Sequence, residues 1–437
     1  MLTRSAVARQ VSNALRGNKL SFAALTEEHT FKQAAPTQLT VPSVQNNKLE
    51  NGLKFTARSR DSGIVNLRFA VLGGSSTESA KQKGAAQFLA ASAFTGNNQN
   101  SGLRVVRYLE SLGATFNATA DREKIVYEVS VLADQVDSAV SVVLSSIASP
   151  PLYNHVFEEH RPTVQLFYDA LREEPTKFLN ELVHEAAFGE TTGFGSSVYA
   201  EDLNNLKVAD ILAYRGAHFV KENLVVAVDG VSSEEFKKIL TAYAGQVPSG
   251  SAQAVGEANF VGGEVKVRNS SVGTSHVALA FGIPAGPAGK AYEVLNATLA
   301  SRLQKKKVCA STFQNKYHNG GFFGLQTRGE ASDIDRILRA SVDELKAIAS
   351  DASAAETAKV QVGVNNFSGL DSKNGADALL NAYLAGTDVN AFLDTRAVTA
   401  QQVSDAAKAV LKSTPAYAVF GATTGTPSLT TVTKILA

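Results

Sequence analysis

The chain has 437 residues, 44% of them hydrophobic, and this length exceeds what one ordinary core accommodates, so we expect at least two packed units. Lys and Arg number 42 against 41 Asp and Glu, a balance that does not suggest a nucleic-acid-binding protein. The single cysteine, Cys309, excludes an intrachain disulfide and suits a reducing compartment. No apolar stretch approaches the ~20 residues of a transmembrane helix, so we expect membrane contact only through partners.

The first 26 residues differ in charge from the rest of the chain. Their four basic side chains precede the first acidic residue, Glu27, and are Arg4, Arg9, Arg16 and Lys19. On a helix, Val7, Val11 and Leu15 would share one face, with Arg9 and Arg16 nearly opposite. This pattern predicts a mitochondrial transit peptide over residues 1–26, and a disordered basic tail is the alternative.

Residues 40–243 are expected to form a first unit that begins after a polar arm. Asn51-Gly52 between Leu49 and Leu53 predicts a hairpin over residues 48–58, and alternating apolar residues predict a half-buried strand over 65–71. Two strands joined by residues 121–123 and a short strand over 223–231 follow from the same periodicity. Helical periodicity and stop signals predict helices at 84–94, 102–113, 136–147, 154–171, 174–188, 206–219 and 233–243.

The same order of elements returns after an aperiodic stretch rich in Gly, Ala and Ser, residues 244–262, which we interpret as a linker. The second unit covers residues 263–437. Its predicted strands are at 276–282 and 416–421, and a strand pair over 313–328 turns at Asn319-Gly320-Gly321. Its predicted helices begin at 291, cover 334–348, and run from Thr399 to 411. An internal duplication explains this order. Each half is therefore predicted to be α+β, with an antiparallel (mixed) sheet and helices packed on one face.

Residues 84–94, GAAQFLAASAF, follow a strand and a Gly73-Gly74 turn. This frame resembles the M16 (inverzincin) metallopeptidase family, whose members carry H-x-x-E-H on the corresponding helix, with two zinc-binding histidines and a glutamate that activates water. In register, those three positions hold Gln87, Ala90 and Ala91. Alanine has no lone pair for zinc and an amide is a poor replacement for imidazole, so we expect no metal, no cofactor and no catalytic residue on this helix.

The resemblance also implies a third zinc ligand, a glutamate, on a later helix, and alignment through residues 182–189 puts that position on or near Phe167. An aromatic side chain there is expected to fill an apolar gap. The segment HVFEEH, residues 155–160, offers two further histidines, but His155 and His160 are five apart and would be separated by about 140° on a helix. We interpret this segment as a charged, exposed helix start.

Two remaining patterns carry less information. Residues 304–308, QKKKV, indicate a solvated cationic loop, with contact to an acidic partner or to anionic lipid headgroups as the alternative. The glycines around Gly282 and Gly286 match no phosphate-binding motif, and no G-x-S-x-G nucleophile elbow is present.

The resemblance to the M16 family extends from about residue 40 to residue 430. Three segments are similar to a core subunit of the mitochondrial cytochrome bc1 complex (complex III): residues 315–324, 380–387 and 417–429. The resemblance implies a non-catalytic subunit on the matrix side of the inner membrane. It would pair with core protein 1 and pack beneath cytochrome b and cytochrome c1 in the dimeric complex that also holds the Rieske subunit.

Two alternatives stay open within the resemblance. The chain could be the non-catalytic subunit of a mitochondrial processing peptidase, although in that subunit a glycine-rich loop precedes an S-R-L segment. Here Ser301-Arg302-Leu303 continues a helical pattern instead. It could also be a peptide-binding subunit that retains a cleaved presequence.

Overall fold

The protein is described by a computed structural model that covers residues 44–437 apart from residues 61, 98 and 270. The predicted transit peptide, residues 1–26, lies outside the described residues, as do residues 40–43 at the start of the first predicted unit. The described residues belong to one compact unit. Within it, two sheets are built from separate parts of the chain, and residues 247–262 between them contain no helix or strand.

The first sheet has six strands in the order β1-β2-β6-β3-β5-β4. β2 and β6 are parallel and the other neighbours are antiparallel. The strands are β1 (Val44–Lys48), β2 (Lys54–Arg58), β3 (Ile64–Leu72), β4 (Thr115–Ala120), β5 (Lys124–Leu132) and β6 (Leu224–Asp229). The described helices of this half of the chain are α2 (Ala85–Ala91), α3 (Gly102–Ser111), α4 (Val136–Ala148), α5 (Asn154–Glu173), α6 (Pro175–Phe188), α7 (Val208–His218) and α8 (Ser233–Tyr243).

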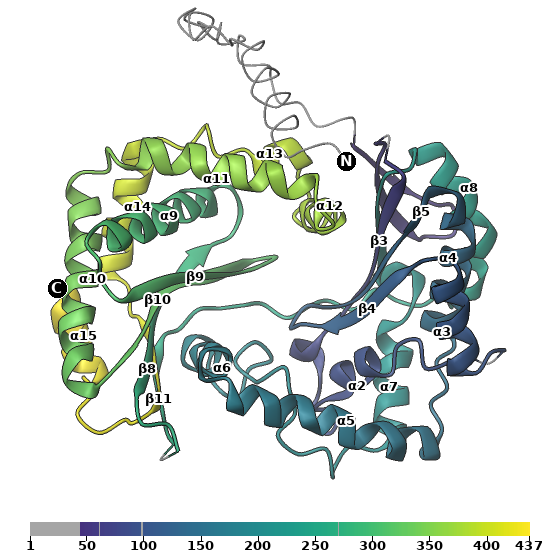
Figure 1. The fold of residues 1–437 in the computed structure, drawn as a ribbon, viewed down its shortest axis with the longest axis horizontal. Coiled ribbons are helices and arrows are strands. Elements are labelled where there is room, and N and C mark those ends of the chain that lie inside the picture. The colour runs from purple at the N-terminus through teal and green to yellow at the C-terminus, as the bar shows by residue number, and fades with distance from the viewer. Residues whose placement is uncertain (1–43, 61, 98, 270) are drawn as a thin grey trace, which may run out of the picture. The chain divides into compact units, whose positions relative to one another are not determined.

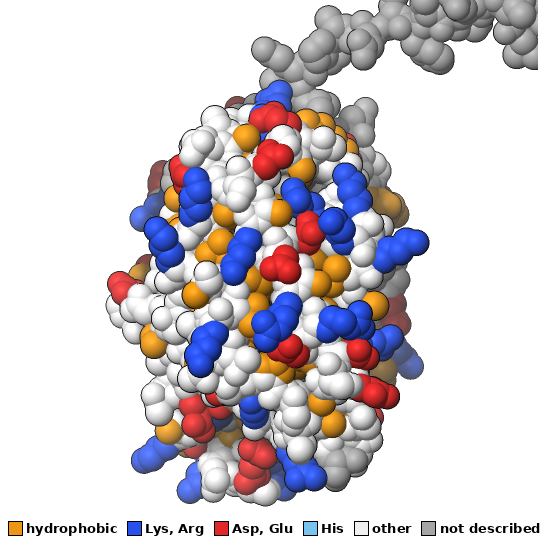
Figure 2. All heavy atoms as spheres, turned by 90° about the vertical axis from the view of Figure 1, so that its left-hand side faces the viewer, with side chains coloured by type: hydrophobic (Ala, Val, Ile, Leu, Met, Phe, Trp, Pro, Cys, Tyr) orange, Lys and Arg blue, Asp and Glu red, His pale blue; other side chains and the backbone are white. Residues whose placement is uncertain are grey.

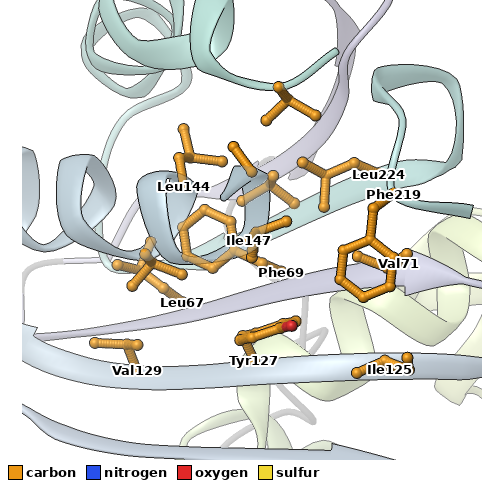
Figure 3. Packing of buried hydrophobic residues seen from close by; sticks show 14 of the residues in the cluster. Leu67, Phe69, Val71, Ile125, Tyr127, Val129, Leu144, Ile147, Phe219 and Leu224 are labelled. Carbon is orange, nitrogen blue, oxygen red and sulfur yellow. The ribbon is translucent and has the colours of Figure 1, made fainter. Parts of the chain in front are cut away.

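The core of the first half lies between this sheet and its own helices. Alternate residues of β3 and β5, among them Phe69 and Tyr127, point toward Leu144 and Ile147 of α4 (Figure 3). All four side chains are 2% exposed or less. Period-2 strands facing period-3.6 helices therefore produce the buried layer that the sequence pattern predicts.

The second sheet has five strands in the order β7-β11-β8-β10-β9, with β7 and β11 parallel. Its strands are β7 (Gly263–Arg268), β8 (Ser275–Pro284), β9 (Ala310–Tyr317), β10 (Gly320–Gly329) and β11 (Ala416–Gly421). Its helices are α9 (Gly289–Lys305), α10 (Ala331–Ser350), α11 (Ala355–Leu370), α12 (Gly375–Leu384), α13 (Val389–Leu393), α14 (Ala400–Lys412) and α15 (Leu429–Leu436). The α+β fold class with mixed sheets is confirmed.

Several local predictions are confirmed in detail. β1 and β2 form the hairpin around Asn51-Gly52, where Gly52 adopts a φ of 96°. Thr399 and Gln402 form the predicted capping box at the start of α14. Short polar and glycine signals thus set these element boundaries without help from tertiary contacts.

Other local predictions need correction. The turn between β9 and β10 is His318-Asn319, because Gly320 and Gly321 already pair with Tyr317 and Lys316. The helix predicted over 84–94 ends at Ala91, and Phe94 has a φ of 61°, which no helix allows. The elements that the periodicity did not predict are β7, α11, α12, α13 and α15.

The two halves exchange a helix. α6, from the first half, lies across β11, β8 and β7, and α12, from the second half, lies across β6, β3 and β2 (Figure 1). Each sheet is therefore covered by its own helices on one face and by a helix of the other half on the second face. The prediction of helices on one face described only the first of these layers.

The strand β3 shows the consequence for burial. The sequence predicts a half-buried strand from the apolar set Val65 to Val71, yet Asn66 and Arg68 on the opposite face are 4% and 3% exposed. Because α12 covers that face, the polar side chains of β3 are buried as well. The expectation of one solvated face was wrong for this strand.

The surface of the second sheet that α6 contacts is apolar and is lined by small side chains. Phe178 of α6 contacts Phe420 of β11, with ring centroids 4.9 Å apart. The sheet surface that faces α6 consists of small residues of the central strands: Ala278, Ala280, Gly324, Ala416 and Ala418. Small side chains let the helix approach the sheet closely, so the fit depends on large residues of α6 filling the remaining space.

Replacing Phe178 by Ala is expected to lower the free energy of unfolding by about 3–5 kcal/mol, because it removes a buried aromatic ring and leaves a cavity between the halves. The matched control is Leu166→Ala on α5, whose side chain is 62% exposed and should cost no more than about 0.5 kcal/mol. Urea unfolding followed by circular dichroism measures both. Equal midpoints for the two variants would show that α6 does not hold the halves together.

Candidate functional site: the helix of the M16 motif and the buried ion pairs

The helix that would carry the zinc motif, α2, is positioned by the turn that follows β3. Gly74 has a φ of 70°, and a Cβ added there would lie 2.5 Å from the carbonyl oxygen of Asp121. Tyr214 of α7 donates its hydroxyl to the carbonyl oxygen of Gly74 at 3.0 Å. Only glycine fits this close approach, and the turn directs the chain back toward the sheet.

Glu78 holds the start of α2. Its carboxylate accepts hydrogen bonds from the backbone N–H groups of Gly84 at 3.0 Å and Ala86 at 2.7 Å, and Lys83 lies 3.8 Å away. Burial raises the pKa of Glu78 to about 7, against the opposing effect of Lys83 and the two N–H groups. Glu78 therefore acts as a cap for this short helix and satisfies donors that the helix leaves free.

The three motif positions lie on this helix, mostly inside the protein. Gln87 is 9% exposed and Ala90 is 4% exposed, whereas Ala91 is half-buried against the first core. The Oε1 atom of Gln87 has no hydrogen-bond partner within the described residues. Two methyl groups and one neutral amide provide no set of zinc ligands and no carboxylate to activate water.

Phe167 does not occupy the place expected for it. The side chain is 40% exposed on α5, so it fills no apolar gap. The residues of α5 that face the core are Phe157, Val164 and Leu171, which follow a seven-residue spacing. Phe157 contacts Phe88 of α2, with ring centroids 5.1 Å apart. The expectation failed because an aromatic residue type does not determine which face of a helix it occupies.

Residues 155–160 lie in the first two turns of α5, where His160 is half-buried, so the expected exposure holds for only one of the two histidines. His155 is exposed and stacks on Tyr153, with ring centroids 5.7 Å apart, and Arg161 pairs with Glu158. Across the described residues, no group of three or more His, Cys, Asp or Glu side chains is arranged to hold a metal ion.

The cationic run ends helix α9. Lys305, Lys306 and Lys307 are exposed, and Lys306 lies 3.6 Å from Glu344 of α10. On α10, Arg336 and Arg339 pair with acidic residues of their own helix. The face at the left of Figure 1 accordingly intersperses Lys and Arg with Asp and Glu (Figure 2). Within the described part of the chain, no helix is both long and apolar enough to cross a membrane.

A buried ion pair that the sequence did not reveal joins the first sheet to α6. Arg122, at the turn between β4 and β5, donates to Glu181 of α6 at 2.8 Å, and the two side chains are 4% and 9% exposed. Arg122 also donates to the carbonyl oxygen of Phe194, and Glu181 accepts from the N–H of Val198. Burial alone would raise the pKa of Glu181, but Arg122 outweighs it and the pKa falls to about 2.

The same helix places a neutral histidine against the second half. Burial, reinforced by the charge of Arg122, lowers the pKa of His184 to about 3. Its Nδ1 lies 2.6 Å from the carbonyl oxygen of Asn180, and its Nε2 lies 2.6 Å from the hydroxyl of Tyr317 on β9. A neutral ring donates from Nδ1 to the carbonyl, so Tyr317 donates its hydroxyl to Nε2. This cluster holds α6 between the hairpins β4–β5 and β9–β10.

A second polar cluster holds α12 on the first sheet. Arg58 of β2 donates to both carboxylate oxygens of Asp229 of β6, at 2.6 and 2.8 Å, and to the carbonyl oxygen of Leu370 at the end of α11. A Cβ at Gly375, the first residue of α12, would lie 2.7 Å from Asp229. Arg68 of β3 pairs with Asp377 of α12 at 2.7 Å. Each exchanged helix therefore makes at least one charge pair with the first sheet, α6 through Glu181 and α12 through Asp377.

Sequence reasoning missed these contacts for a physical reason. Arg58, Arg68 and Arg122 lie in a predicted hairpin, strand and turn, respectively. The neighbouring residues do not indicate that these arginines are buried, and they do not identify partners more than 50 residues away. The one available signal was a charged residue placed inside an otherwise apolar strand, as Arg68 is. An arginine at such a position indicates a partner on the second face of the sheet.

Comparisons with known proteins agree with this architecture. Sequence models of two families match the chain: Insulinase (Peptidase family M16) over residues 55–200 and Peptidase M16 inactive domain over residues 205–364. The chain belongs to the M16 peptidase family. The second match begins ahead of α7, so it includes β6 and α8, which the structure assigns to the first sheet and its helices.

Among the similar curated proteins are subunits of the mitochondrial-processing peptidase and of the cytochrome b-c1 complex. Mitochondrial-processing peptidase subunit alpha of Solanum tuberosum is 24% identical over 92% of this chain and 86% of its own length. Mitochondrial-processing peptidase subunit beta of Mus musculus is 24% identical over 75% of this chain and 73% of its own. Cytochrome b-c1 complex subunit 1 of Homo sapiens is 24% identical over 77% of this chain and 75% of its own length.

Replacing Arg122 by Met is expected to lower the free energy of unfolding by about 3–5 kcal/mol, because the carboxylate of Glu181 would remain buried without its cation. The native pair contributes stability above the unfolded pKa of Glu181, and this contribution is lost as pH falls through about 2. In the variant, burial would raise the pKa of Glu181. The loss of stability should therefore be larger at pH 8 than at pH 5, measured by urea unfolding at both values.

The control for this prediction is Arg339→Met on α10. Among the described residues, Arg339 pairs with Asp335 of its own helix, and both side chains are more than two-fifths exposed, so the change should be below about 0.5 kcal/mol at either pH. If the loss of unfolding free energy in Arg122→Met does not increase with pH, Glu181 is not the buried charge left without a partner.

Proposed function

We propose that this chain is a non-catalytic M16 subunit that serves as core protein 2 of the mitochondrial ubiquinol-cytochrome c reductase, complex III. It would support assembly and stability of the complex from the matrix side of the inner membrane. Its partners would be core protein 1, cytochrome b, cytochrome c1 and the Rieske subunit, and electron transfer would belong to the subunits that hold haem and the iron-sulfur cluster.

One observation carries the non-catalytic part of the proposal. The helix in the position of the zinc motif is present and buried, but Gln87, Ala90 and Ala91 stand at its three functional positions. A fold that retains this helix without its ligands retains the scaffold of a peptidase and none of the groups that such hydrolysis requires. Assembly of a larger complex is the use that we propose for this M16 fold.

The choice of complex III is supported by two further observations. Cytochrome b-c1 complex subunit 1 is among the similar proteins. The segment that precedes Ser301-Arg302-Leu303 is helical, since α9 runs without interruption from Gly289 to Lys305. In the substrate-binding subunit of the processing peptidase, a glycine-rich loop is expected in that place.

The second candidate is the non-catalytic subunit of a mitochondrial processing peptidase. It is favoured by the coverage of the Solanum tuberosum alpha subunit, which aligns with 92% of this chain. A subunit of that kind would bind precursor peptides and leave hydrolysis to a zinc-bearing partner. A third role, retention of a cleaved presequence between core subunits, would accompany the complex III assignment without replacing it.

Blue-native electrophoresis separates the first two candidates. Mitochondria from the source organism are solubilised in a mild detergent, and the gel is probed with an antibody to this chain and stained for haem. The chain is expected to migrate with a haem-staining band of complex III. Migration with a zinc-containing partner in a band without haem would replace the complex III proposal by the processing peptidase.

The isolated chain is expected to bind no zinc with 1:1 stoichiometry and to cleave no presequence peptide, because α2 offers no ligand set. Elemental analysis after dialysis against zinc, with a catalytic M16 subunit as positive control, measures the first property. A fluorogenic presequence peptide measures the second. Stoichiometric zinc together with cleavage would show that a different set of residues assembles an active site.

A further inference from the structure

A cavity of about 390 Å³ lies where α6 crosses the second sheet. Its apolar wall includes Leu171 at the end of α5, Leu179 and Val183 of α6, and Phe313 of β9. Its volume falls in the range of small-molecule sites, and its lining combines apolar side chains with a few polar groups, as such sites do. The cavity is separate from the motif positions on α2, none of which lines it.

The polar groups in the cavity are largely uncommitted. Asn315 of β9 donates its amide to the side-chain oxygen of Asn180 at 2.8 Å, which leaves the Oδ1 atom of Asn315 and the second amide of the pair without a side-chain partner among the described residues. Within the same residues, the Gln326 amide and the Tyr199 hydroxyl make no hydrogen bond. Such groups gain by meeting a ligand that hydrogen-bonds to them.

The charges around the cavity favour an anion. Glu181 lines it, but its oxygens are already committed to Arg122 and to the N–H of Val198. Lys177 lies at the rim, paired 2.9 Å from Glu174, with the two side chains 66% and 57% exposed. An exposed pair of this kind exchanges its partner easily, so Lys177 is available to a negatively charged ligand.

We propose that this cavity binds a small amphipathic carboxylate. The carboxylate meets Lys177 at the rim, an amide or hydroxyl group of the ligand bonds with Asn315 and Gln326, and its apolar body packs on Leu179 and Phe313. The residues that line the cavity, from α5, α6, the loop at Tyr199 and the second sheet, all belong to this chain, so the proposal does not depend on the complex that the protein joins.

The test uses N-acetyl-L-leucine as probe, since it combines a carboxylate, an amide and a branched apolar group. N-acetyl-L-leucinamide is the matched probe without the charge. Saturation-transfer NMR with the purified full-length chain is expected to show binding of the carboxylate in the range of about 1 mM and binding of the amide several-fold weaker.

Three variants locate the site. Lys177→Met should weaken binding of the carboxylate by about threefold to tenfold and leave the neutral probe unchanged, because it removes only the charge. Gln326→Leu should weaken both probes. Thr176→Trp, which places a large side chain at an exposed lining position, should abolish binding of both. The control is Lys408→Met, a half-exposed lysine on α14 outside the cavity.

The outcomes decide the proposal. Equal binding of the two probes would overturn the carboxylate assignment, and binding that survives Thr176→Trp would show that the probe occupies another site. Absence of any signal up to about 10 mM would overturn the proposal as a whole. Circular dichroism of each variant confirms that it is folded, so that a lost signal reports on the cavity.

Discussion

The structure depends on an exchange of helices between its two halves, with buried arginines at its centre. The helices of each half cover only one face of its sheet. The other face is covered by a helix from the opposite half, α12 on the first sheet and α6 on the second. Arg122 reaches α6 through Glu181, and Arg68 reaches α12 through Asp377. An ion pair buried at such a contact is costly to break, because the remaining charge stays in a medium of low polarity.

Both contacts combine apolar packing with charge pairs. Phe178 packs against Phe420 under α6, which also carries the buried Glu181, whereas α12 buries Leu379 and Leu380 and pairs with Arg68 through Asp377. Apolar contact supplies area and stability without strict geometry. Charge pairs add little net stability. They disfavour a helix that is shifted along the sheet, because a displaced arginine would lose its carboxylate partner. Together they join the halves in one arrangement.

The contacts that hold the helix α2 in place are independent of the residue types at positions 87, 90 and 91. The helix α2 is held by the Glu78 cap, by the Gly74 turn and by contact of Phe88 with Phe157. None of these contacts uses the side chains at positions 87, 90 and 91. The packing around α2 therefore does not require zinc-binding side chains at these positions.

The local sequence determined most of the secondary structure. Periodicity, the Asn51-Gly52 turn and the Thr399 capping box predicted the main strands and helices, and the residue types at 87, 90 and 91 excluded zinc ligation at those positions by their chemistry alone. These features depend on neighbours a few residues away, which the sequence displays. The orientation of Phe167, the burial of both faces of β3 and the pairing of Arg58, Arg68 and Arg122 were decided by tertiary structure. Each depends on which distant helix covers a sheet, and no short-range pattern encodes a partner that lies tens to hundreds of residues along the chain.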